Sequence, residues 1–265
     1  MKVGEVFVDM MGREVIVNYP PRRIVSLVPS QTELLYELGL EEEVVGITKF
    51  CVHPDSWYRH KTRVGGTKNV NMQRIAALQP DLIIANKEEN TREQIEELAK
   101  LYPVWISDIS DLSGAMEMIK GVGRVTNRSE QSVKMVDSIL LNFNDLSKFS
   151  VAKKVAYFIW KNPWMCAGGD TFISDMISRL GWVNVFGEIN RYPEVTLAAL
   201  KETGAELILL SSEPYPFKQQ HIDEITQVMH QAQVMLVDGE MFSWYGSRLL
   251  HTTGYFNSLM EQVNH

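Results

Sequence analysis

The sequence contains few cysteines, no long hydrophobic run and no excess of positive charge. Its two cysteines, Cys51 and Cys166, are too few for the disulfide framework of a small secreted domain, and no C-x-x-C pair predicts a zinc ribbon. No stretch approaches the roughly 18 apolar residues of a membrane-spanning helix, so we expect no membrane insertion. The 26 Lys and Arg residues are outnumbered by 33 Asp and Glu residues, and this net charge of −7 argues against nucleic-acid binding.

Enzyme motifs and a signal peptide are also missing from the sequence. We find no G-x-S-x-G elbow, H-E-x-x-H helix or Walker motif, and therefore expect a protein that is not an enzyme and has no intrinsic cofactor. The first residues, MKVGEVFVDM, lack the apolar core of a signal peptide. As written, the chain is expected in the cytoplasm, and in the periplasm or cell envelope if a leader precedes residue 1. We also expect a monomer.

Short apolar runs alternate with helical patterns in the first half of the chain. Alternation of this kind is typical of an α/β fold with a mostly parallel sheet. Two sequences, Ser30 to Glu33 and Thr91 to Gln94, have the form of a capping box at a helix start. A small hairpin is expected within residues 6–17. The predicted buried strands are residues 24–28, 44–47, 81–85 and 104–106.

The middle of the chain predicts one long helix, after which the first-half pattern repeats. Gly121, Gly123 and Asn127 are expected to interrupt the segment before it. Apolar residues at spacings of three and four then predict a helix of roughly 30 Å. We therefore predict two similar α/β lobes joined by this helix, with a ligand cleft between them. The predicted boundaries are an N-terminal lobe at 1–127, a linking helix at 128–149 and a C-terminal lobe at 150–265.

Three features carry a resemblance to a known family. The segments PPRRIVSLVPSQTE at 20–33 and IAALQPDLIIA at 75–85, together with the linking helix, resemble the class III, helical-backbone solute-binding proteins of ABC importers. The likeness covers nearly the whole chain and is nearest to the cobalamin-binding and iron-chelate-binding members. It implies capture of a bulky metal chelate, with a corrinoid first and haem or a ferric siderophore as alternatives, for delivery to an ABC permease.

The resemblance also implies where the ligand is bound. In the family, loops after the first strand of each lobe line the cleft, and two further loops contribute. The positions that match in this chain, together with aromatic and polar neighbours in the same loops, are Ser30, Gln31, Thr32, Phe50, Cys51, His53, Trp164, Met165, Trp244, Tyr245 and Arg248. Tyr192, in a loop before Pro193, is a further candidate for ligand contact.

The side-chain chemistry of two loops suits such a ligand. Trp164 with Met165, and Trp244 with Tyr245, offer flat or polarisable apolar surface to a macrocycle. Arg248 is suited to pairing with a carboxylate or phosphate of the ligand. In the alternative interpretation Trp164 packs as local core, and Arg248 pairs with Asp238 or Glu240.

Cys51 and His53 leave two interpretations open. Imidazole and thiolate both suit cobalt and iron, so either residue could contact a chelated metal. Alternatively, Cys51 is a small buried side chain and His53 caps a turn before Pro54. An enzyme that acts on a cofactor through these two residues is a further, lower-ranked alternative.

The expected docking residues depart from the family pattern. Members place an acidic residue on each lobe, which pairs with arginines of the permease. The matching positions here are Gln73 and Ala198, with Glu194 and Glu202 near the second. This departure favours a second hypothesis, an intracellular chelate carrier or sensor that no longer docks a permease.

Overall fold

The computed structural model describes residues 4–146 and 152–264, and its backbone contacts divide them into two compact units. Unit 1 comprises the described residues up to Ile109, then Ser113–Leu140 and Tyr245–Arg248. Unit 2 comprises Ser110–Leu112, the described residues from Leu141 to Trp244, and those from Leu249 onward. This division is not contiguous, whereas the boundaries predicted from the sequence are.

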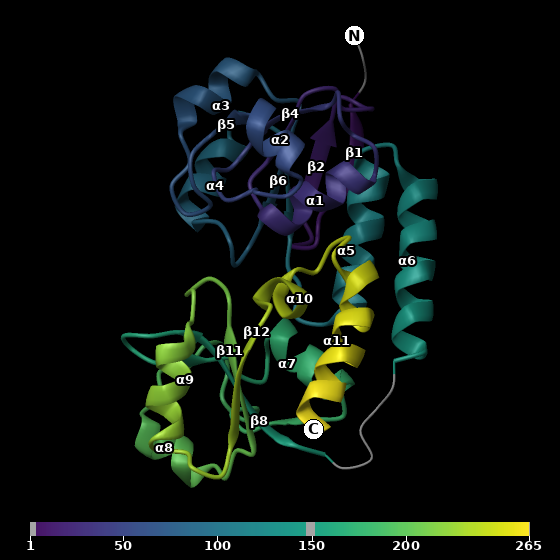
Figure 1. Cartoon of the computed structure of the whole chain (residues 1–265). Coiled ribbons are helices and arrows are strands. Elements are labelled where there is room, and N and C mark those ends of the chain that lie inside the picture. The colour runs from purple at the N-terminus through teal and green to yellow at the C-terminus, as the bar shows by residue number, and fades with distance from the viewer. Residues whose placement is uncertain (1–3, 147–151, 265) are drawn as a thin grey trace. The chain divides into compact units, whose positions relative to one another are not determined.

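Unit 1 contains a five-stranded, wholly parallel sheet, as predicted (Figure 1). Its strand order is β5-β4-β3-β6-β7. All five residues of β6 are buried, which is the pattern expected of a parallel strand covered on both faces. The strands are β3 (Ile24–Ser26), β4 (Val44–Ile47), β5 (Thr62–Arg63), β6 (Leu82–Asn86) and β7 (Val104–Ser107).

Helices cover both faces of this sheet. Buried residues of α3 and α4 pack with Val25, Leu27 and Ile83 in one hydrophobic cluster, and α1 lies on the other side of the sheet in Figure 1. The helices are α1 (Pro29–Glu37), α2 (Asp55–His60), α3 (Met72–Leu78) and α4 (Arg92–Ala99).

Both predicted capping boxes are wrong. Helix α1 begins one residue before Ser30, and its N-cap residue, Val28, makes no side-chain capping bond. Thr91 is the N-cap residue of α4, but its hydroxyl donates to the carbonyl oxygen of Lys68 at 2.9 Å instead of capping the helix. In both cases tertiary partners compete for side chains that a local sequence pattern assigns to the helix end.

The predicted N-terminal hairpin is confirmed as β1 (Glu5–Val8) and β2 (Glu14–Val17), which pair antiparallel. Asp9 and Arg13 form an ion pair at 2.6 Å across its turn. Arg13 Nη2 also donates to the carbonyl oxygen of Val104 at 2.8 Å, and this bond attaches the hairpin to β7.

The long helix predicted at residues 128–149 corresponds to α6 (Ser129–Asn144), and the segment before it, expected to be interrupted, forms a further helix, α5 (Leu112–Val125). Gly121 and Gly123 do not interrupt α5. A Cβ atom on Gly121 would lie 2.7 Å from the Trp105 ring, and one on Gly123 would lie 2.1 Å from Ser132 Oγ, so these glycines permit close packing. The chain passes from unit 1 to unit 2 within α6, and the predicted end of the linking helix, residues 147–149, lies outside the described residues.

Unit 2 repeats the topology of unit 1, as predicted. Its strands follow the order β10-β8-β11-β12, which corresponds to β4-β3-β6-β7, and the short β9 pairs antiparallel with β8. The strands are β8 (Lys154–Trp160), β9 (Met165–Cys166), β10 (Val183–Asn184), β11 (Leu207–Ser211) and β12 (Gln233–Val237). The helices are α7 (Phe172–Arg179), α8 (Leu197–Glu202), α9 (Gln219–Thr226), α10 (Gly239–Ser243) and α11 (Leu249–Asn264).

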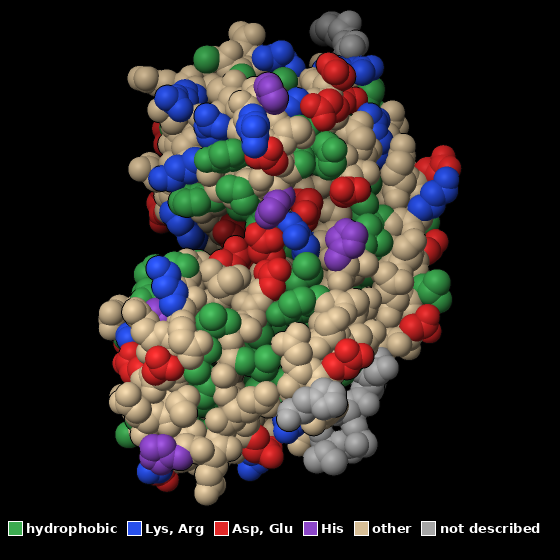
Figure 2. All heavy atoms as spheres, in the orientation of Figure 1, with side chains coloured by type: hydrophobic (Ala, Val, Ile, Leu, Met, Phe, Trp, Pro, Cys, Tyr) green, Lys and Arg blue, Asp and Glu red, His purple; other side chains and the backbone are tan. Residues whose placement is uncertain are grey.

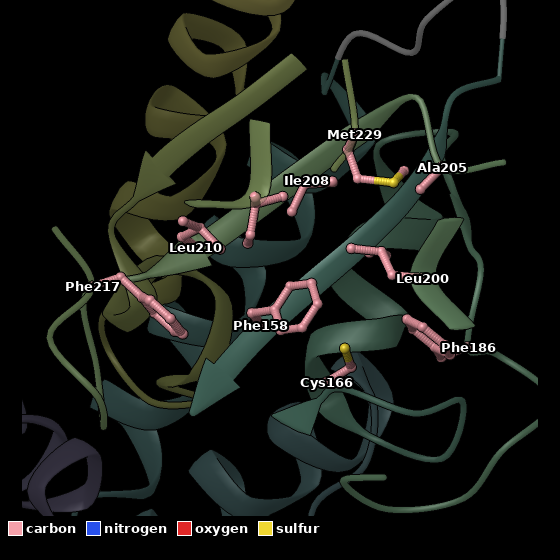
Figure 3. Packing of buried hydrophobic residues seen from close by; sticks show 11 residues of the cluster. Phe158, Cys166, Phe186, Leu200, Ala205, Ile208, Leu210, Phe217 and Met229 are labelled. Carbon is pink, nitrogen blue, oxygen red and sulfur yellow. The ribbon is translucent and has the colours of Figure 1, made fainter. Parts of the chain in front are cut away.

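One hydrophobic cluster of unit 2 includes buried residues of its sheet and of α8 and α9 (Figure 3). Phe158 of β8, Leu210 of β11 and Leu200 of α8 are fully buried there, and Cys166 joins the same cluster as a free thiol. Within residues 4–146 and 152–264, every helix is too short or too polar to cross a lipid bilayer.

Candidate functional site

The predicted ligand-binding residues lie mainly in loops and helix starts that follow the carboxyl ends of parallel strands. In open α/β sheets this edge is where ligands are bound, because the loops there converge and helix N-termini point toward it. The edge of each unit has its own set of side chains.

Ser30, Gln31 and Thr32 lie in the first turn of α1, directly after β3, and all three side chains are buried. Gln31 Nε2 donates a hydrogen bond to Ser107 Oγ. Gln31 Oε1 is buried and has no hydrogen-bond partner among residues 4–146 and 152–264. A buried amide oxygen without a partner is destabilising, so an incoming polar group or a water molecule at this atom would be stabilised.

Cys51 lies in a buried network of threonine hydroxyl groups. Its side chain has no exposed surface, Thr32 Oγ1 donates to its sulfur at 3.0 Å, and Thr48 Oγ1 lies 3.1 Å from the same atom. Burial raises the pKa of the Cys51 thiol, whereas the thiolate is the form that binds metals. The structure therefore favours the alternative of a small buried side chain, and the described residues contain no group of three or more His, Cys, Asp or Glu able to hold a metal ion.

Phe50 is the exposed aromatic residue in the loop after β4, with half of its surface (50%) accessible. The ammonium of Lys49 lies 5.0 Å from its ring centroid, within the range of a cation–π contact. His53 is half-buried in the turn that precedes α2. Of these predicted residues, Phe50 offers the larger surface to a ligand.

Sequence reasoning missed the polar residues at the ends of β6 and β7. Asn86 Nδ2 donates to Ser107 Oγ at 3.0 Å, and Asn86 Oδ1 accepts from the backbone N–H groups of Glu88 and Glu89. Burial raises the pKa of Glu89, and the nearby charge of Lys68 offsets part of this effect. The signal available in the sequence was Asn86 itself, a polar residue that ends the otherwise apolar run 82–86.

In unit 2, Trp164 belongs to a group of rings that we call the aromatic cluster. Trp164 stacks on Phe217 with centroids 5.9 Å apart and planes inclined by 7°. Tyr215 lies 4.8 Å from Phe217 and 5.5 Å from Trp160. The members of the aromatic cluster are Trp160, Trp164, Tyr215, Phe217 and His221.

The aromatic cluster extends from the hydrophobic core of unit 2 to the solvent-exposed surface. Phe217 is buried, Trp164 and Tyr215 are half-buried against the same hydrophobic cluster, and Trp160 is 40% exposed. The alternative that Trp164 packs as local core therefore holds for part of its surface. Tyr215 and Phe217 were missed, although both follow the apolar strand β11 in the segment SSEPYPF.

An ion pair flanks the aromatic cluster, and one member of the cluster is a histidine. Lys161 Nζ lies 4.9 Å from the Trp164 ring centroid and forms an ion pair with Glu224. His221 Nδ1 accepts from the backbone N–H of Lys218 at 2.9 Å, so its other nitrogen carries the proton of the neutral ring. Burial, reinforced by the charge of Lys161, lowers the pKa of His221.

Met165 and Tyr192 lie close together along the same edge. Met165 pairs with Trp160 in the β8–β9 ladder and forms an isolated bridge with Glu194. The guanidinium of Arg191 lies 5.7 Å from the Tyr192 ring. Both predicted side chains are half-buried, so each retains surface that a ligand could contact.

The predicted stacking residues Trp244 and Tyr245 are buried. Trp244 Nε1 donates to Glu213 Oε1 at 2.7 Å. Arg248 pairs with Glu33 of α1 through two bonds, 2.7 Å from Nη2 and 3.1 Å from Nε, a partner that neither sequence interpretation had considered. The structure therefore gives Arg248 a role in holding residues 245–248 against α1.

Gln73 and Ala198 occupy equivalent positions in the two units. Each is the second residue of its helix and is exposed: Gln73 lies on α3, which precedes β6, and Ala198 lies on α8, which precedes the equivalent strand β11. Neither can supply the carboxylate that the resemblance implies at that position.

Comparison with known proteins gives matches across most of the chain. The sequence profile of a family described as periplasmic binding protein matches residues 24–232. The chain is 27% identical over 256 residues to an uncharacterised ABC transporter substrate-binding lipoprotein, YvrC, of Bacillus subtilis strain 168, covering 91% of this chain and 81% of that protein. It is 26% identical over 199 residues to the vitamin B12-binding protein of Vibrio campbellii, covering 73% of this chain and 72% of that one.

A solved structure shares the fold. A possible iron-binding, periplasmic solute-binding protein from Staphylococcus epidermidis matches with a TM-score of 0.78 at 22% identity, covering 93% of this chain and 100% of that chain.

Proposed function

Since the chain belongs to the periplasmic binding protein family, we propose that it captures a bulky metal chelate and delivers it to an ABC importer. A corrinoid is the first candidate ligand, and haem and ferric siderophores are the alternatives. Two names support this class: one relative is a vitamin B12-binding protein, and one structural neighbour is described as possibly iron-binding. In this proposal the protein catalyses no reaction and needs no cofactor of its own.

The observation that carries the proposal is the aromatic cluster at the carboxyl edge of the unit 2 sheet. Its rings lie 4.8 to 5.9 Å apart and are anchored in the core through Phe217, while Trp160 remains 40% exposed. Rigid, partly exposed rings give a flat ligand apolar contact at little cost in conformational entropy. A corrin or porphyrin ring has the matching shape and apolar surface.

We assign the predicted residues to two roles according to their exposure. The half-exposed ones are proposed as direct ligand contacts, and the buried ones are proposed to support the loops that carry those contacts. The proposed contacts are Phe50, His53, Trp164, Met165 and Tyr192, and we add Trp160, the most exposed ring of the aromatic cluster. The proposed supports are Ser30, Gln31, Thr32, Cys51, Trp244 and Tyr245, together with Arg248 through its pair with Glu33.

We propose that the protein works as a monomer outside the cytoplasmic membrane. The relative named as a lipoprotein supports this location. The competing hypothesis of an intracellular carrier is supported by the missing carboxylates at Gln73 and Ala198. Fractionation of the source cells, with antibody detection in cytoplasm and cell envelope, separates the two locations. Gel filtration with light scattering tests the monomer.

The ligand test is an absorption and calorimetric titration with cyanocobalamin, haemin and a ferric hydroxamate. We expect saturable binding of one of them at one site. The variant Trp160→Ala should weaken that binding about tenfold, because it removes an aromatic contact worth roughly 0.5–1.5 kcal/mol beyond its buried area. Tyr36→Ala is the matched control, since Tyr36 is 39% exposed but lies on α1, outside the aromatic cluster.

Titrations that show no binding signal for any of the three chelates would contradict the proposal for this ligand class. Equal losses of affinity in Trp160→Ala and Tyr36→Ala would still support chelate binding by the parent. They would contradict the proposal that the aromatic cluster is the binding site.

A further inference from the structure

His221 is hydrogen-bonded to the segment that carries two rings of the aromatic cluster. This segment, residues 215–218, connects β11 to α9 and includes Tyr215 and Phe217. Figure 2 shows a Lys or Arg side chain beside hydrophobic side chains in the region of unit 2 where, in Figure 1, β11 leads into α9. His221 itself lies in the first turn of α9 and is buried. Since it is not among the proposed ligand contacts, its position predicts a different role.

Two hydrogen bonds attach the end of this segment to the first turn of α9. The backbone N–H of Lys218 donates to His221 Nδ1 at 2.9 Å, and the backbone N–H of His221 donates to the carbonyl oxygen of Lys218 at 2.9 Å. In the first bond, the side chain at the third helical position accepts from the backbone of the N-cap residue, as in one half of a capping box. The imidazole therefore determines how residues 215–218 join the helix.

The imidazole ring also contacts both aromatic rings of the segment. Its centroid lies 5.5 Å from that of Tyr215 and 5.4 Å from that of Phe217, with the planes inclined by 65° and 88°. Phe217 in turn stacks on Trp164. A displacement of the imidazole ring would therefore affect three other rings of the aromatic cluster.

Protonation of His221 is incompatible with this arrangement. A neutral imidazole has one acceptor nitrogen, whereas both nitrogens of the imidazolium ion carry a proton and can only donate. With a proton on Nδ1, two N–H groups would face each other across the 2.9 Å that separates Nδ1 from the Lys218 nitrogen. Uptake of a proton from solvent therefore breaks this hydrogen bond and displaces the ring from the segment.

The charged groups around His221 act in the same direction. Lys161 and Lys218 disfavour a positive charge on the ring, and Glu224, which favours it, is engaged in an ion pair with Lys161. Burial, followed by the charge of Lys161, lowers the pKa of His221, so the folded protein contains the neutral ring at pH 7. The remaining groups that face Nε2, at 3.4 and 3.3 Å, are uncharged at this pH: the Tyr215 phenol and the Gln220 amide.

From these contacts we propose that His221 is a positioning residue for chelate binding that acts in its neutral form, and that its protonation releases residues 215–218 and lowers the affinity for the chelate. This inference rests on the proposed function and adds a dependence on pH to it. Because a bound chelate needs the rings in place, binding and protonation oppose each other. Chelate binding in mildly acidic solution should therefore expel a proton from His221.

The test is a titration of the full chain with cyanocobalamin, haemin and a ferric hydroxamate at pH 7.5 and again at pH 5.5. For the chelate that binds, we expect about tenfold lower affinity at pH 5.5, the change that corresponds to one hydrogen bond left unmade. Calorimetry at pH 6 in two buffers of different ionisation enthalpy should show more proton release on binding in the parent than in His221→Asn.

Two substitutions separate the hydrogen bond of His221 from its ring. An Asn side chain places its oxygen close to the position of Nδ1 and does not titrate, so the affinity of His221→Asn should be the same at both pH values. His221→Phe keeps an aromatic ring without an acceptor, so its affinity at pH 7.5 should be close to that of the parent at pH 5.5. His230→Asn is the matched control, since His230 is exposed and follows α9, outside the aromatic cluster. It should retain the pH dependence of the parent.

Two measurements on the parent without chelate separate this role from a general loss of structure. Nitrogen-15 NMR of the His221 ring should show the tautomer with the proton on Nε2 at pH 7.5. After correction for intrinsic exchange, the Lys218 amide should exchange faster with solvent at pH 5.5 than at pH 7.5, while far-UV circular dichroism stays the same.

Equal chelate affinity of the parent at both pH values would overturn the inference. A pH dependence that persists unchanged in His221→Asn would overturn it as well, because another group would then be responsible. Absence of binding at both pH values would instead count against the proposed function. In that case, an unchanged exchange rate of the Lys218 amide at pH 5.5 would independently overturn the role of His221.

Discussion

The two sheets share one strand order but differ in the chemistry of their carboxyl edges. In unit 1 this edge is a buried polar network that includes Gln31, Asn86 and Ser107, with Phe50 as its exposed ring. In unit 2 the same edge carries the aromatic cluster, with Trp160 open to solvent. The difference teaches that the internal repeat conserves strand order, while the loops after equivalent strands can have unrelated functions.

The two edges also differ in how they are stabilised. Directional hydrogen bonds hold the unit 1 edge, so each polar atom depends on a particular partner. The unit 2 edge is held by ring packing continuous with the hydrophobic core through Phe217. The effects of substitutions on the free energy of unfolding should therefore differ between the two units in size and in pH dependence.

The largest expected effect is at the base of the aromatic cluster. Phe158→Ala should lower the free energy of unfolding by about 3–5 kcal/mol, because it removes a fully buried ring of β8 and leaves a cavity in its place. Phe158 also contacts Trp164 edge to face at 5.4 Å, so chelate affinity should fall as well. Urea unfolding measures the first effect and titration the second. A loss below about 1 kcal/mol would contradict this account of the unit 2 edge.

A smaller loss is expected in the polar network of unit 1. Asn86→Ala should cost about 1–3 kcal/mol, because it removes the acceptor of two backbone N–H groups and a donor to Ser107. Gln31→Met is the control within the same network. It removes an amide oxygen that has no partner among the described residues, so its net cost should stay below about 1 kcal/mol. Equal costs for the two variants would show that the Gln31 amide is fully satisfied.

The pH dependence of stability should differ between the two edges. In unit 2 the group responsible is His221. Its pKa is lowered in the folded protein by burial and by Lys161, so below about pH 6.5 the unfolded chain binds a proton that the folded chain does not. Stability should therefore fall as the pH drops from 7 toward 5. His221→Gln should show a shallower fall over that range in denaturant titrations at successive pH values. An identical slope in both proteins would assign the fall to other groups.

The smallest expected effect has the opposite sign and lies in unit 1. Burial raises the pKa of Glu89, so above about pH 4.5 the folded chain holds a proton that the unfolded chain has released. Stability is therefore lost as the pH rises through this window, and Glu89→Gln should be more stable than the parent at pH 7. The gain should vanish toward pH 4. A variant less stable than the parent at pH 7 would mean that the charged Glu89 carboxylate is stabilising.

The sequence predicted the family and most of the architecture. The resemblance carried by residues 20–33 and 75–85 is confirmed by the family match over residues 24–232. The alternation of buried runs and helices, and its repeat in the second half, is confirmed by the two parallel sheets. These features were accessible because a buried parallel strand is a continuous apolar run, which neighbouring residues alone define.

Some local patterns gave the wrong answer because distant residues compete for the same groups. Glu33 was expected to cap α1, but its carboxylate binds Arg248, 215 positions along the chain. Gly121 and Gly123 were expected to interrupt a helix, but Trp105 and Ser132 pack against them. The predicted ligand contacts remain a prediction, because exposure alone does not show which side chains meet a ligand.

By itself, the sequence determined the order of strands and helices, the internal repeat and the family, since each depends on residue type and near-neighbour spacing. Tertiary structure alone decided which side chains are buried, that Trp164 meets Phe217, and that Cys51 lies among threonine hydroxyls. Such contacts join segments that follow different strands, and only the folded sheet brings those strand ends together.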